Sequence, residues 1–372
     1  MDAFFVSVER ILDPSLMGKP VIVGGDPNGR GIAAACSYET RKYGVQSGMP
    51  ARTAYRLCPN ALFIHGHGKE YGRYSKLVKK FLDGYFSVVQ QASIDEFSLD
   101  FTGCETIYGD ALSFAKRIQS EIFNLFKLPC SIGIASNKTL AKIASDFNKP
   151  MGVTYVPAGK EKEFLAPLPI EKIPGIGKKL LPLLRTRGFR IVSDIADTSP
   201  DYLAAILGKF GLDLWEKANG RGNDLVVVEH ERKSISKETT FDTDLVDKAK
   251  IESILFDLTA KACQLLRDEN FQSSTISIKL RYSDFVTITR AKTVKNTDDD
   301  KVVYDTAVDL FRKAYTRRVG VRLIGIHLSK LSSFGEQEVL FADENVIRKR
   351  MLRAVMKIRG KYGYNSIHIG KN

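Results

Sequence analysis

Apolar positions change their spacing several times along the 372 residues of this chain. From residue 1 to about 71, short apolar runs alternate with turn signals such as Asp-Pro-Asn-Gly at 26–29, which predicts short strands and helices. The next region, to about residue 156, predicts a helix, a strand hairpin at 88–101, a helix over 108–126, a strand over 130–135 and a helix over 138–147. This order predicts an antiparallel-rich α+β sheet backed by helices.

The remaining pattern predicts two further regions. Residues from about 160 to 230 are typical of an all-helical segment, and residues 233 to about 331 of long strands with two helices. In the strand at 275–282, Ser277 and Lys279 alternate with apolar residues at period two, which makes one face polar and basic. Such a face fits along a phosphate backbone, although a half-solvated sheet explains the pattern equally well. The chain is too long for one compact core, so several domains are expected.

Charge narrows the choice of partner. Lys and Arg number 56 against 43 Asp and Glu, a net charge of +13 that favours nucleic acid first and an anionic membrane surface second. No apolar run reaches the length of a membrane span, and no signal peptide opens the sequence. The five scattered cysteines form no Cys-x-x-Cys pair, so they predict reduced thiols in a cytoplasmic protein, without a zinc site or disulfide framework.

Two adjacent carboxylates, Asp95 and Glu96, occupy the predicted hairpin turn in Ser-Ile-Asp-Glu-Phe at 93–97. They repel each other unless a cation lies between them, and a hard ion such as Mg²⁺ fits while leaving room for substrate phosphates. For an isolated pair, a solvated turn is the alternative. The metal interpretation gains support only from the other motifs of the chain.

Three further residues supply the cationic side of a phosphate site. Tyr38 and Arg41 lie three residues apart on one face of a predicted helix, where the guanidinium can bind phosphate oxygens bidentately beside the hydroxyl. Lys149 follows the helix at 138–147 and adds a cation near the hairpin sheet. With the carboxylates, these residues are the parts of a nucleoside-triphosphate site, although each alone is compatible with a solvated surface charge.

Ile-Pro-Gly-Ile-Gly at 173–177 is typical of a helix–hairpin–helix. Gly175 and Gly177 permit a tight turn that directs backbone amides and a helix N-terminus toward a phosphate, and Lys178 and Lys179 add charge. Such hairpins hold a DNA backbone without reading its sequence. A plain helix–helix connection with a glycine cap is the alternative.

Seven motifs occur in family order, and through them the chain resembles Y-family DNA polymerases of the bacterial polymerase IV (DinB) type over nearly its whole length. They are Met-Asp-Ala-Phe-Phe at 1–5, Tyr-x-x-Arg-Lys-Tyr-Gly at 38–44, Ser-Ile-Asp-Glu at 93–96, Ser-Asn-Lys at 136–138, Lys-Ile-Ala-Ser at 142–145, Lys-Pro at 149–150 and Pro-Gly-Ile-Gly at 174–177. The resemblance implies an α+β multidomain right hand. Its parts would be a palm at 1–9 and 71–159, fingers at 10–70, a thumb at 160–231, a little finger at 232–332 and a C-terminal region at 333–372.

The resemblance implies a low-fidelity, translesion DNA polymerase that adds deoxynucleoside triphosphates to a primer on template DNA. Asp95 and Glu96 would bind two catalytic Mg²⁺ ions. The incoming triphosphate would be held by Tyr38, Arg41 and Lys149.

The resemblance also implies how nucleotides and partners are selected. Phe5 would be the steric gate, whose ring fills the space of a ribose 2′-hydroxyl, and small side chains at 32–35 would leave the roof over the nascent pair loose. We expect a monomer. Gln-x-x-Leu-Phe at 337–341 matches the peptide by which bacterial polymerases bind the sliding clamp (β clamp). An extended segment would insert Leu340 and Phe341 into an apolar pocket, oriented by Gln337.

The start of the sequence departs from the family pattern. In the family an apolar strand ends in Asp-Met-Asp, and its first aspartate is a principal metal ligand, whereas the sequence given begins at the middle Met. By strand geometry Asp2 would lie about 6.6 Å from that carboxylate, and a ligand must lie at about 2.1 Å from Mg²⁺. We therefore expect the chain as given to be severely impaired, and a start codon misassigned to an internal Met would explain the loss.

Two other functions stay open at this stage. Ser-Ile-Asp-Glu-Phe superficially resembles the Gly-Gly-Asp-Glu-Phe turn of diguanylate cyclases, but the helix–hairpin–helix and the later basic domain argue against a cyclase. The second alternative is a catalytically inactive accessory protein that binds the clamp and DNA. The missing aspartate favours it, and the retained carboxylates and triphosphate-binding residues argue against it.

Overall fold

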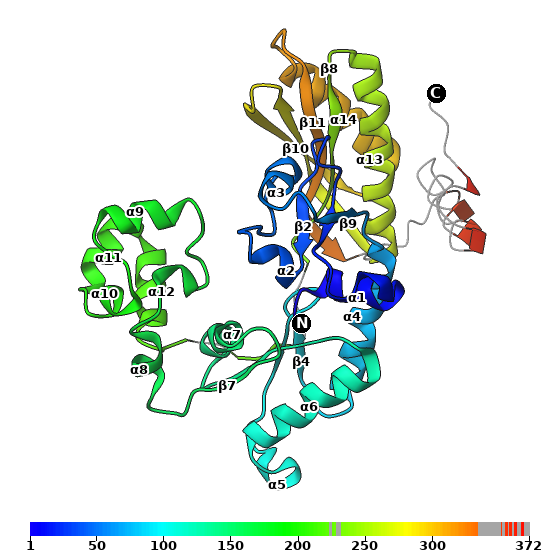
Figure 1. Cartoon of the computed structure of the whole chain (residues 1–372). Coiled ribbons are helices and arrows are strands. Elements are labelled where there is room, and N and C mark those ends of the chain that lie inside the picture. The colour runs from blue at the N-terminus through cyan, green and yellow to red at the C-terminus, as the bar shows by residue number, and fades with distance from the viewer. Residues whose placement is uncertain are drawn as a thin grey trace, which may run out of the picture. The chain divides into compact units, whose positions relative to one another are not determined.

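The computed structural model describes residues 1–222, 225–227 and 232–333, together with residues 351, 354, 355, 357, 358, 361, 362, 366 and 367. They form two compact units, Met1–His230 and Glu231–Asn372, each of which is treated by itself (Figure 1). None of the helices in this described part combines the length and apolar composition needed to span a membrane.

The first 70 residues fold into short helices around a three-stranded sheet with the order β2-β1-β3. β1 runs antiparallel to β2 and parallel to β3. Ala33 and Ala35 of β2 are buried and Ala34 is exposed, as the pleat requires. The predicted alternation of short strands and helices is confirmed. The elements are α1 (Phe4–Leu12), the 3-10 turn η1 (Pro14–Leu16), β1 (Val21–Gly24), β2 (Ala33–Cys36), α2 (Tyr38–Arg41), α3 (Ala51–Leu57) and β3 (Leu62–Ile64).

The following region keeps the predicted order of elements, but its strands pair differently. β4 and β5 form the expected antiparallel hairpin, with Val89 opposite Leu99. β6 and β7 instead form a separate parallel pair, which is possible because α7 provides the crossover between them. The elements are α4 (Gly68–Asp83), β4 (Val89–Gln91), β5 (Phe97–Leu99), α5 (Glu105–Tyr108), α6 (Ala111–Phe126), β6 (Ile132–Ile134), α7 (Lys138–Phe147) and β7 (Val153–Tyr155).

Helix α7 is fixed at both its start and its buried face. Asn137 is the N-cap, and its Oδ1 accepts a hydrogen bond from the Leu140 amide at 2.9 Å. Leu140 and Ile143 are buried in a cluster that extends into the helical region after β7. α7 therefore packs between the parallel strands and that region.

The segment from 160 to 222 is all-helical, as predicted. The motif at 173–177 follows a single 3-10 turn and leads into α9, and Gly175 has φ +107°, which an L side chain rarely adopts. Gly177 has no such constraint, and a Cβ there would meet nothing within 4 Å. The elements are α8 (Glu161–Leu165), η2 (Ile170–Lys172), α9 (Leu180–Thr186), α10 (Val192–Ala196), α11 (Pro200–Leu207) and α12 (Lys209–Ala218).

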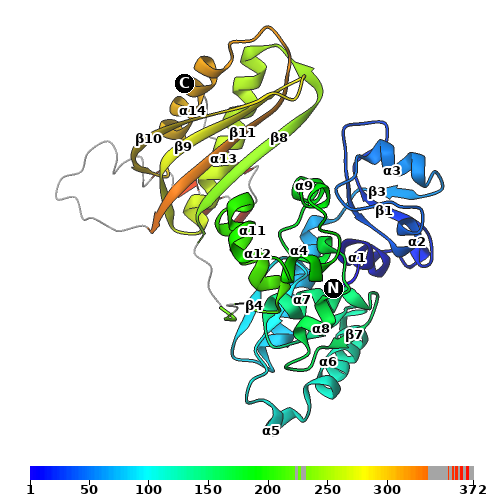
Figure 2. The same cartoon turned by 90° about the vertical axis from the view of Figure 1, so that its left-hand side faces the viewer.

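The second unit is a four-stranded antiparallel sheet, with the order β10-β9-β11-β8, covered by two helices (Figure 2). Ile276, Ile278 and Leu280 of β9 are fully buried in its core, whereas Lys279 is partly exposed and pairs with Glu238 at 2.8 Å. The predicted long strands with two helices are confirmed, and the period-two pattern holds at Lys279, whereas Ser277 is buried. The elements are β8 (Ser234–Leu245), α13 (Lys248–Asp268), β9 (Phe271–Tyr282), β10 (Thr287–Thr297), α14 (Asp300–Ala314) and β11 (Val321–Ser333).

Candidate active site

Asp95 and Glu96 lie in the turn between β4 and β5, where the sequence predicts them. The Ala92 amide donates to the Glu96 carbonyl at 2.9 Å and closes the turn. Asp95 Oδ1 accepts a hydrogen bond from Ser93 Oγ at 2.8 Å, which orients the carboxylate. Both side chains remain accessible to solvent, so the turn presents two carboxylates outward.

Lys142 is a member of this site that sequence reasoning placed in a motif but gave no role. Its ammonium forms an ion pair with Glu96 Oε1. One helical turn earlier on α7, Lys138 Nζ donates to Gln90 Oε1 on β4 at 2.9 Å. The i, i+4 spacing of Lys138 and Lys142 could have predicted that both reach the hairpin, because it puts them on one face of α7.

Asp2 has a structural task. It is 1% exposed, and its Oδ2 accepts hydrogen bonds from Ser131 Oγ and from the Met151 amide, both at 2.8 Å. Directly after it, Ala3 adopts a left-handed conformation (φ 42°) and α1 begins. The chain therefore turns at Ala3 and the Asp2 carboxylate is buried, whereas its distance from the family's first aspartate stays a prediction.

Met1 and Asp2 connect the carboxylate turn with the cations. The amino nitrogen of Met1 donates to the Asp95 carbonyl at 2.7 Å, and the Asp2 amide donates to the Pro129 carbonyl at 2.8 Å. The negative charge of Asp2 also raises the pKa values of Tyr38 and Lys149. The Met1–Asp2 segment therefore contacts the carboxylate turn and lies within electrostatic reach of Tyr38 and Lys149.

Tyr38 and Arg41 share one face of α2, as their spacing predicts. The guanidinium of Arg41 lies over the Tyr38 ring, 4.5 Å from its centroid, and its Nε donates to the Cys36 carbonyl at 3.3 Å. Burial is the main reason that the pKa of Tyr38 is raised, and the Asp2 carboxylate adds to it. The hydroxyl thus stays protonated, and within the described residues it is buried without a hydrogen-bond partner.

Lys149 is the second predicted cation, after Arg41. Its Nζ lies 2.6 Å from Asp146 Oδ1. Burial acts to lower the pKa of Lys149, but the bond and charge of Asp146 outweigh it, so the pKa is raised. The positive charges of Arg41 and Lys149 both act on Tyr38, although burial and the Asp2 carboxylate outweigh them and the pKa of Tyr38 is raised.

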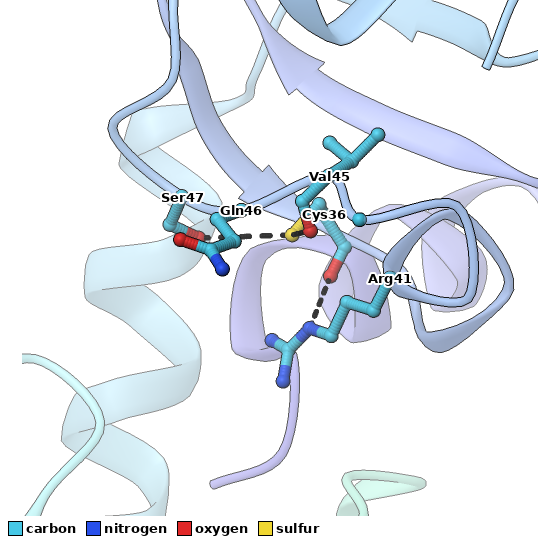
Figure 3. A pocket seen from close by; sticks show the side chains of 6 residues that line it. Cys36, Arg41, Val45, Gln46 and Ser47 are labelled. Atoms are coloured by element: carbon cyan, nitrogen blue, oxygen red, sulfur yellow. Dashed lines mark hydrogen bonds between the residues drawn. The ribbon is translucent and has the colours of Figure 1, made fainter. Parts of the chain in front are cut away.

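An open pocket lies beside Arg41, at the end of β2 and in the loop after α2 (Figure 3). Figure 3 shows the Arg41 guanidinium extending from the wall, with Gln46 and Ser47 on the other side. Cys36 Sγ lies 3.6 Å from the Val45 carbonyl and anchors the loop. Sequence reasoning missed Gln46 and Ser47, since polar loop residues carry no distinguishing pattern.

Phe5 lies on α1 and is partly buried. Its ring stacks on that of Tyr71 in α4, with centroids 4.2 Å apart and planes 9° from parallel. A ring held from behind in this way can act as a fixed steric boundary.

The carboxylates fit a magnesium ion that is completed by substrate. Among the residues that the structure describes, no group of three or more His, Cys, Asp and Glu side chains is placed to hold a metal. Mg²⁺ commonly takes only one or two carboxylates and fills its octahedron with water and substrate phosphates. Asp95 and Glu96 meet that requirement.

The remaining predicted positions differ in what can be said of them. Lys178 and Lys179 are exposed beside the glycine turn that precedes α9. Gln337, Leu340 and Phe341 lie outside the described residues.

Comparisons with known proteins identify the chain. The impB/mucB/samB family matches residues 1–146, the C-terminal domain of that family matches 232–340, and its HHH motif matches 159–189. DNA polymerase IV of Lactococcus lactis subsp. cremoris is 40% identical over 343 residues, which covers 91% of this chain and 93% of that protein. This chain belongs to the DinB-type Y family of DNA polymerases.

Further relatives agree with this Y-family assignment. DNA polymerase IV of Dehalococcoides mccartyi is 39% identical over 374 residues, covering 100% of this chain and 95% of that protein. Among solved structures, a Y-family DNA polymerase chimera matches with a TM-score of 0.80 at 29% identity, over 89% of this chain and 97% of that one. DinB from Sulfolobus solfataricus matches with a TM-score of 0.60 at 29% identity, over 88% and 96%.

Membership in the Y family confirms the α+β multidomain polymerase fold. It also confirms a DNA-directed DNA polymerase of the translesion type and removes the cyclase alternative. None of these comparisons supports the inactive accessory protein. Y-family polymerases depend on a divalent metal, which agrees with the exposed carboxylate pair.

Proposed function

We propose that this Y-family polymerase joins a deoxynucleotide to a primer at the turn between β4 and β5, with Asp95 and Glu96 as ligands of two Mg²⁺ ions. One observation carries the proposal: the Met1–Asp2 segment contacts the carboxylate turn and lies within electrostatic reach of Tyr38 and Lys149. When bound, the ions would polarise the phosphoryl oxygens and activate the primer 3′-hydroxyl.

The chain's own residues then have separate tasks. Ser93 holds Asp95 in place, and Lys142 pairs with the Glu96 carboxylate that would hold a metal ion. Tyr38 donates its hydroxyl, which has no hydrogen-bond partner within the described part of the chain, to the triphosphate. Arg41 and Lys149 supply the positive charge that a transferring phosphoryl group requires. Phe5 is the steric gate against ribonucleotides.

Asparagine or glutamine at the carboxylates tests the metal assignment. Asp95→Asn and Glu96→Gln should each lower kcat for single-nucleotide primer extension by about 10³-fold or more, because each removes a metal ligand. Asp100→Asn is the matched control, since that exposed carboxylate caps the Thr102 amide at 3.0 Å just beyond β5. Manganese binding, followed by water relaxation, should weaken in the first two variants only. Extension within tenfold of the parent chain in both would refute the assignment.

The DNA backbone is proposed to contact the glycine turn at 173–177. Gly175 and Gly177 with Lys178 and Lys179 would hold the backbone of the duplex, supported by the exposed charge of both lysines. The domain bounds are proposed from the resemblance to the family. They are a palm at 1–9 and 71–159, fingers at 10–70, a thumb at 160–231, a little finger at 232–332 and a C-terminal region at 333–372.

The proposed partner beyond DNA is the sliding clamp, bound through Gln337, Leu340 and Phe341, with the polymerase itself a monomer in the cytoplasm. Clamp binding is supported only by the Gln-x-x-Leu-Phe pattern at 337–341. Leu340→Ala with Phe341→Ala should abolish binding to immobilised clamp while clamp-free extension stays unchanged. Retained binding would remove this peptide from the proposal. Light scattering of the purified chain tests the monomer.

A further inference from the structure

Phe5 and Glu9 lie one turn apart on the same face of α1, and both contact Tyr71 of α4. Phe5 receives the face of the tyrosine ring, stacked at 4.2 Å between centroids. Glu9 accepts a hydrogen bond from its hydroxyl. The two ends of one tyrosine are therefore held by one helix.

Glu9 is a buried carboxylate with a second partner. Its side chain is 3% exposed, and its Oε1 also accepts from the His67 amide at 3.0 Å. Its Oε2 lies 2.9 Å from His67 Nδ1. Burying a carboxylate is costly unless such bonds compensate it, so this geometry belongs to a built network.

The surroundings leave the tyrosine ring no alternative position. Tyr71 is 4% exposed, and its hydroxyl also lies 3.1 Å from the His67 amide. A Cβ at Gly66 would lie 2.5 Å from that hydroxyl and 2.9 Å from Val23 Cγ1, so the chain before α4 closes tightly over it. Burial and the Glu9 bond raise the pKa of Tyr71, which keeps the hydroxyl protonated as a donor.

We propose that Glu9 and His67 are positioning residues for sugar selection: they fix Tyr71, and the Tyr71 ring fixes Phe5 where it excludes a ribose 2′-hydroxyl. The inference rests on the proposed role of Phe5 as steric gate. A gate ring that can retreat by a few tenths of an ångström accommodates an extra oxygen, whereas a ring backed by a stacked, hydrogen-bonded neighbour does not. Discrimination against ribonucleotides is thus a property of four residues.

The test measures kcat/KM for a deoxynucleotide and for the matching ribonucleotide on the same preparation of the full chain. Their ratio is independent of the fraction of folded enzyme, so a merely structural defect leaves it unchanged. Tyr71→Phe removes the bond to Glu9 while keeping the ring. Glu9→Gln keeps the shape but replaces the charged acceptor of the Tyr71 hydroxyl with a neutral amide oxygen, which weakens that hydrogen bond.

We expect Tyr71→Phe and Glu9→Gln each to lower the deoxy-to-ribo ratio by about 5- to 20-fold, and Phe5→Ala by about 100-fold or more. Combining Tyr71→Phe with Phe5→Ala should lower the ratio no further than Phe5→Ala alone, because both changes act through one ring. Tyr74→Phe is the matched control on α4, since it removes a hydroxyl from a ring that lies under the Arg73 guanidinium, 4.8 Å from its centroid. Its ratio should equal that of the parent chain.

Each outcome decides a different claim. If Phe5→Ala leaves the ratio unchanged, Phe5 is not the gate and the proposed function of that residue fails. If Phe5→Ala lowers the ratio but Tyr71→Phe changes it by less than about twofold, the gate stands and the positioning network is overturned. Should Glu9→Gln not fold, Tyr71→Phe alone decides.

Discussion

Replacing Gly133 with alanine should displace α7 and remove most of the polymerase activity. Gly133 is the central residue of β6, directly beneath α7. A methyl carbon built there would lie 1.9 Å from the Ala141 carbonyl oxygen and 2.4 Å from the Ser145 amide nitrogen. Both are backbone atoms of the helix, so no side-chain rotation relieves the overlap.

The size of the displacement follows from these distances. Ordinary contact begins near 3.4 Å, so the helix must move away from the strand by about 1.5 Å. Because α7 carries Lys138 and Lys142 to the carboxylate hairpin, a shift of this size should cost about 10²-fold in kcat/KM. Overpacking of this kind also destabilises the fold by about 1–3 kcal/mol.

Single-nucleotide primer extension measures the effect, with active-site titration to correct for unfolded enzyme and circular dichroism to follow melting. The matched control is Gly72→Ala in α4, where a Cβ would meet nothing within 4 Å. It should keep full activity and gain about 0.5–1 kcal/mol of stability as a helix substitution. If Gly133→Ala retains kcat/KM within about threefold of the parent chain, close packing of β6 against α7 does not position the site.

Two further predictions concern charges. Lys149→Met should raise KM for the deoxynucleotide by about tenfold, read by steady-state primer extension. The pKa of Lys149 is raised, so its side chain stays positively charged up to and above its ordinary titration range. KM should therefore stay level from neutral pH to about pH 10. A rise in KM below that pH contradicts the cationic role. In the second unit, Arg267 and Asp300 form a buried pair at 3.1 Å, with side chains 5% and 7% exposed. Asp300→Leu or Arg267→Met alone should cost about 3–5 kcal/mol, because each leaves the other charge buried without its partner. The double variant Arg267→Met with Asp300→Leu should cost clearly less than these two single costs combined, measured by hydrogen exchange of the β9 amides in the full chain. Additive costs would refute the coupling.

Local chemistry explains why much of the fold could be predicted. Asn137 ends a loop and starts α7 because its side chain caps the first turn, and that signal is contained in four residues. In β9, buried Ile278 and partly exposed Lys279 differ because successive side chains of a strand point to opposite faces. Tyr38 and Arg41 lie on one helix face because their spacing requires it.

The candidate site was predictable only as a set of residue types. Motif order predicts Asp95, Glu96 and three candidate triphosphate residues, but no spacing along the chain shows whether positions 38, 95 and 149 lie close together. Asp2 was placed by strand geometry, and the structure instead turns it toward Ser131 and the Met151 amide. A left-handed residue at Ala3 carries no strong sequence signal, since alanine rarely adopts that conformation.

The sequence by itself determined most element types and the family, and it predicted the candidate reacting side chains, because periodicity, capping and motif order are local properties. Only the tertiary structure decided which side chains share a contact. Lys142 reaches Glu96 across 46 residues, Glu9 reaches His67 across 58, and Gly133 admits the backbone of α7. Such contacts depend on how separate elements pack in space, and close packing fixes that arrangement to within a fraction of an ångström.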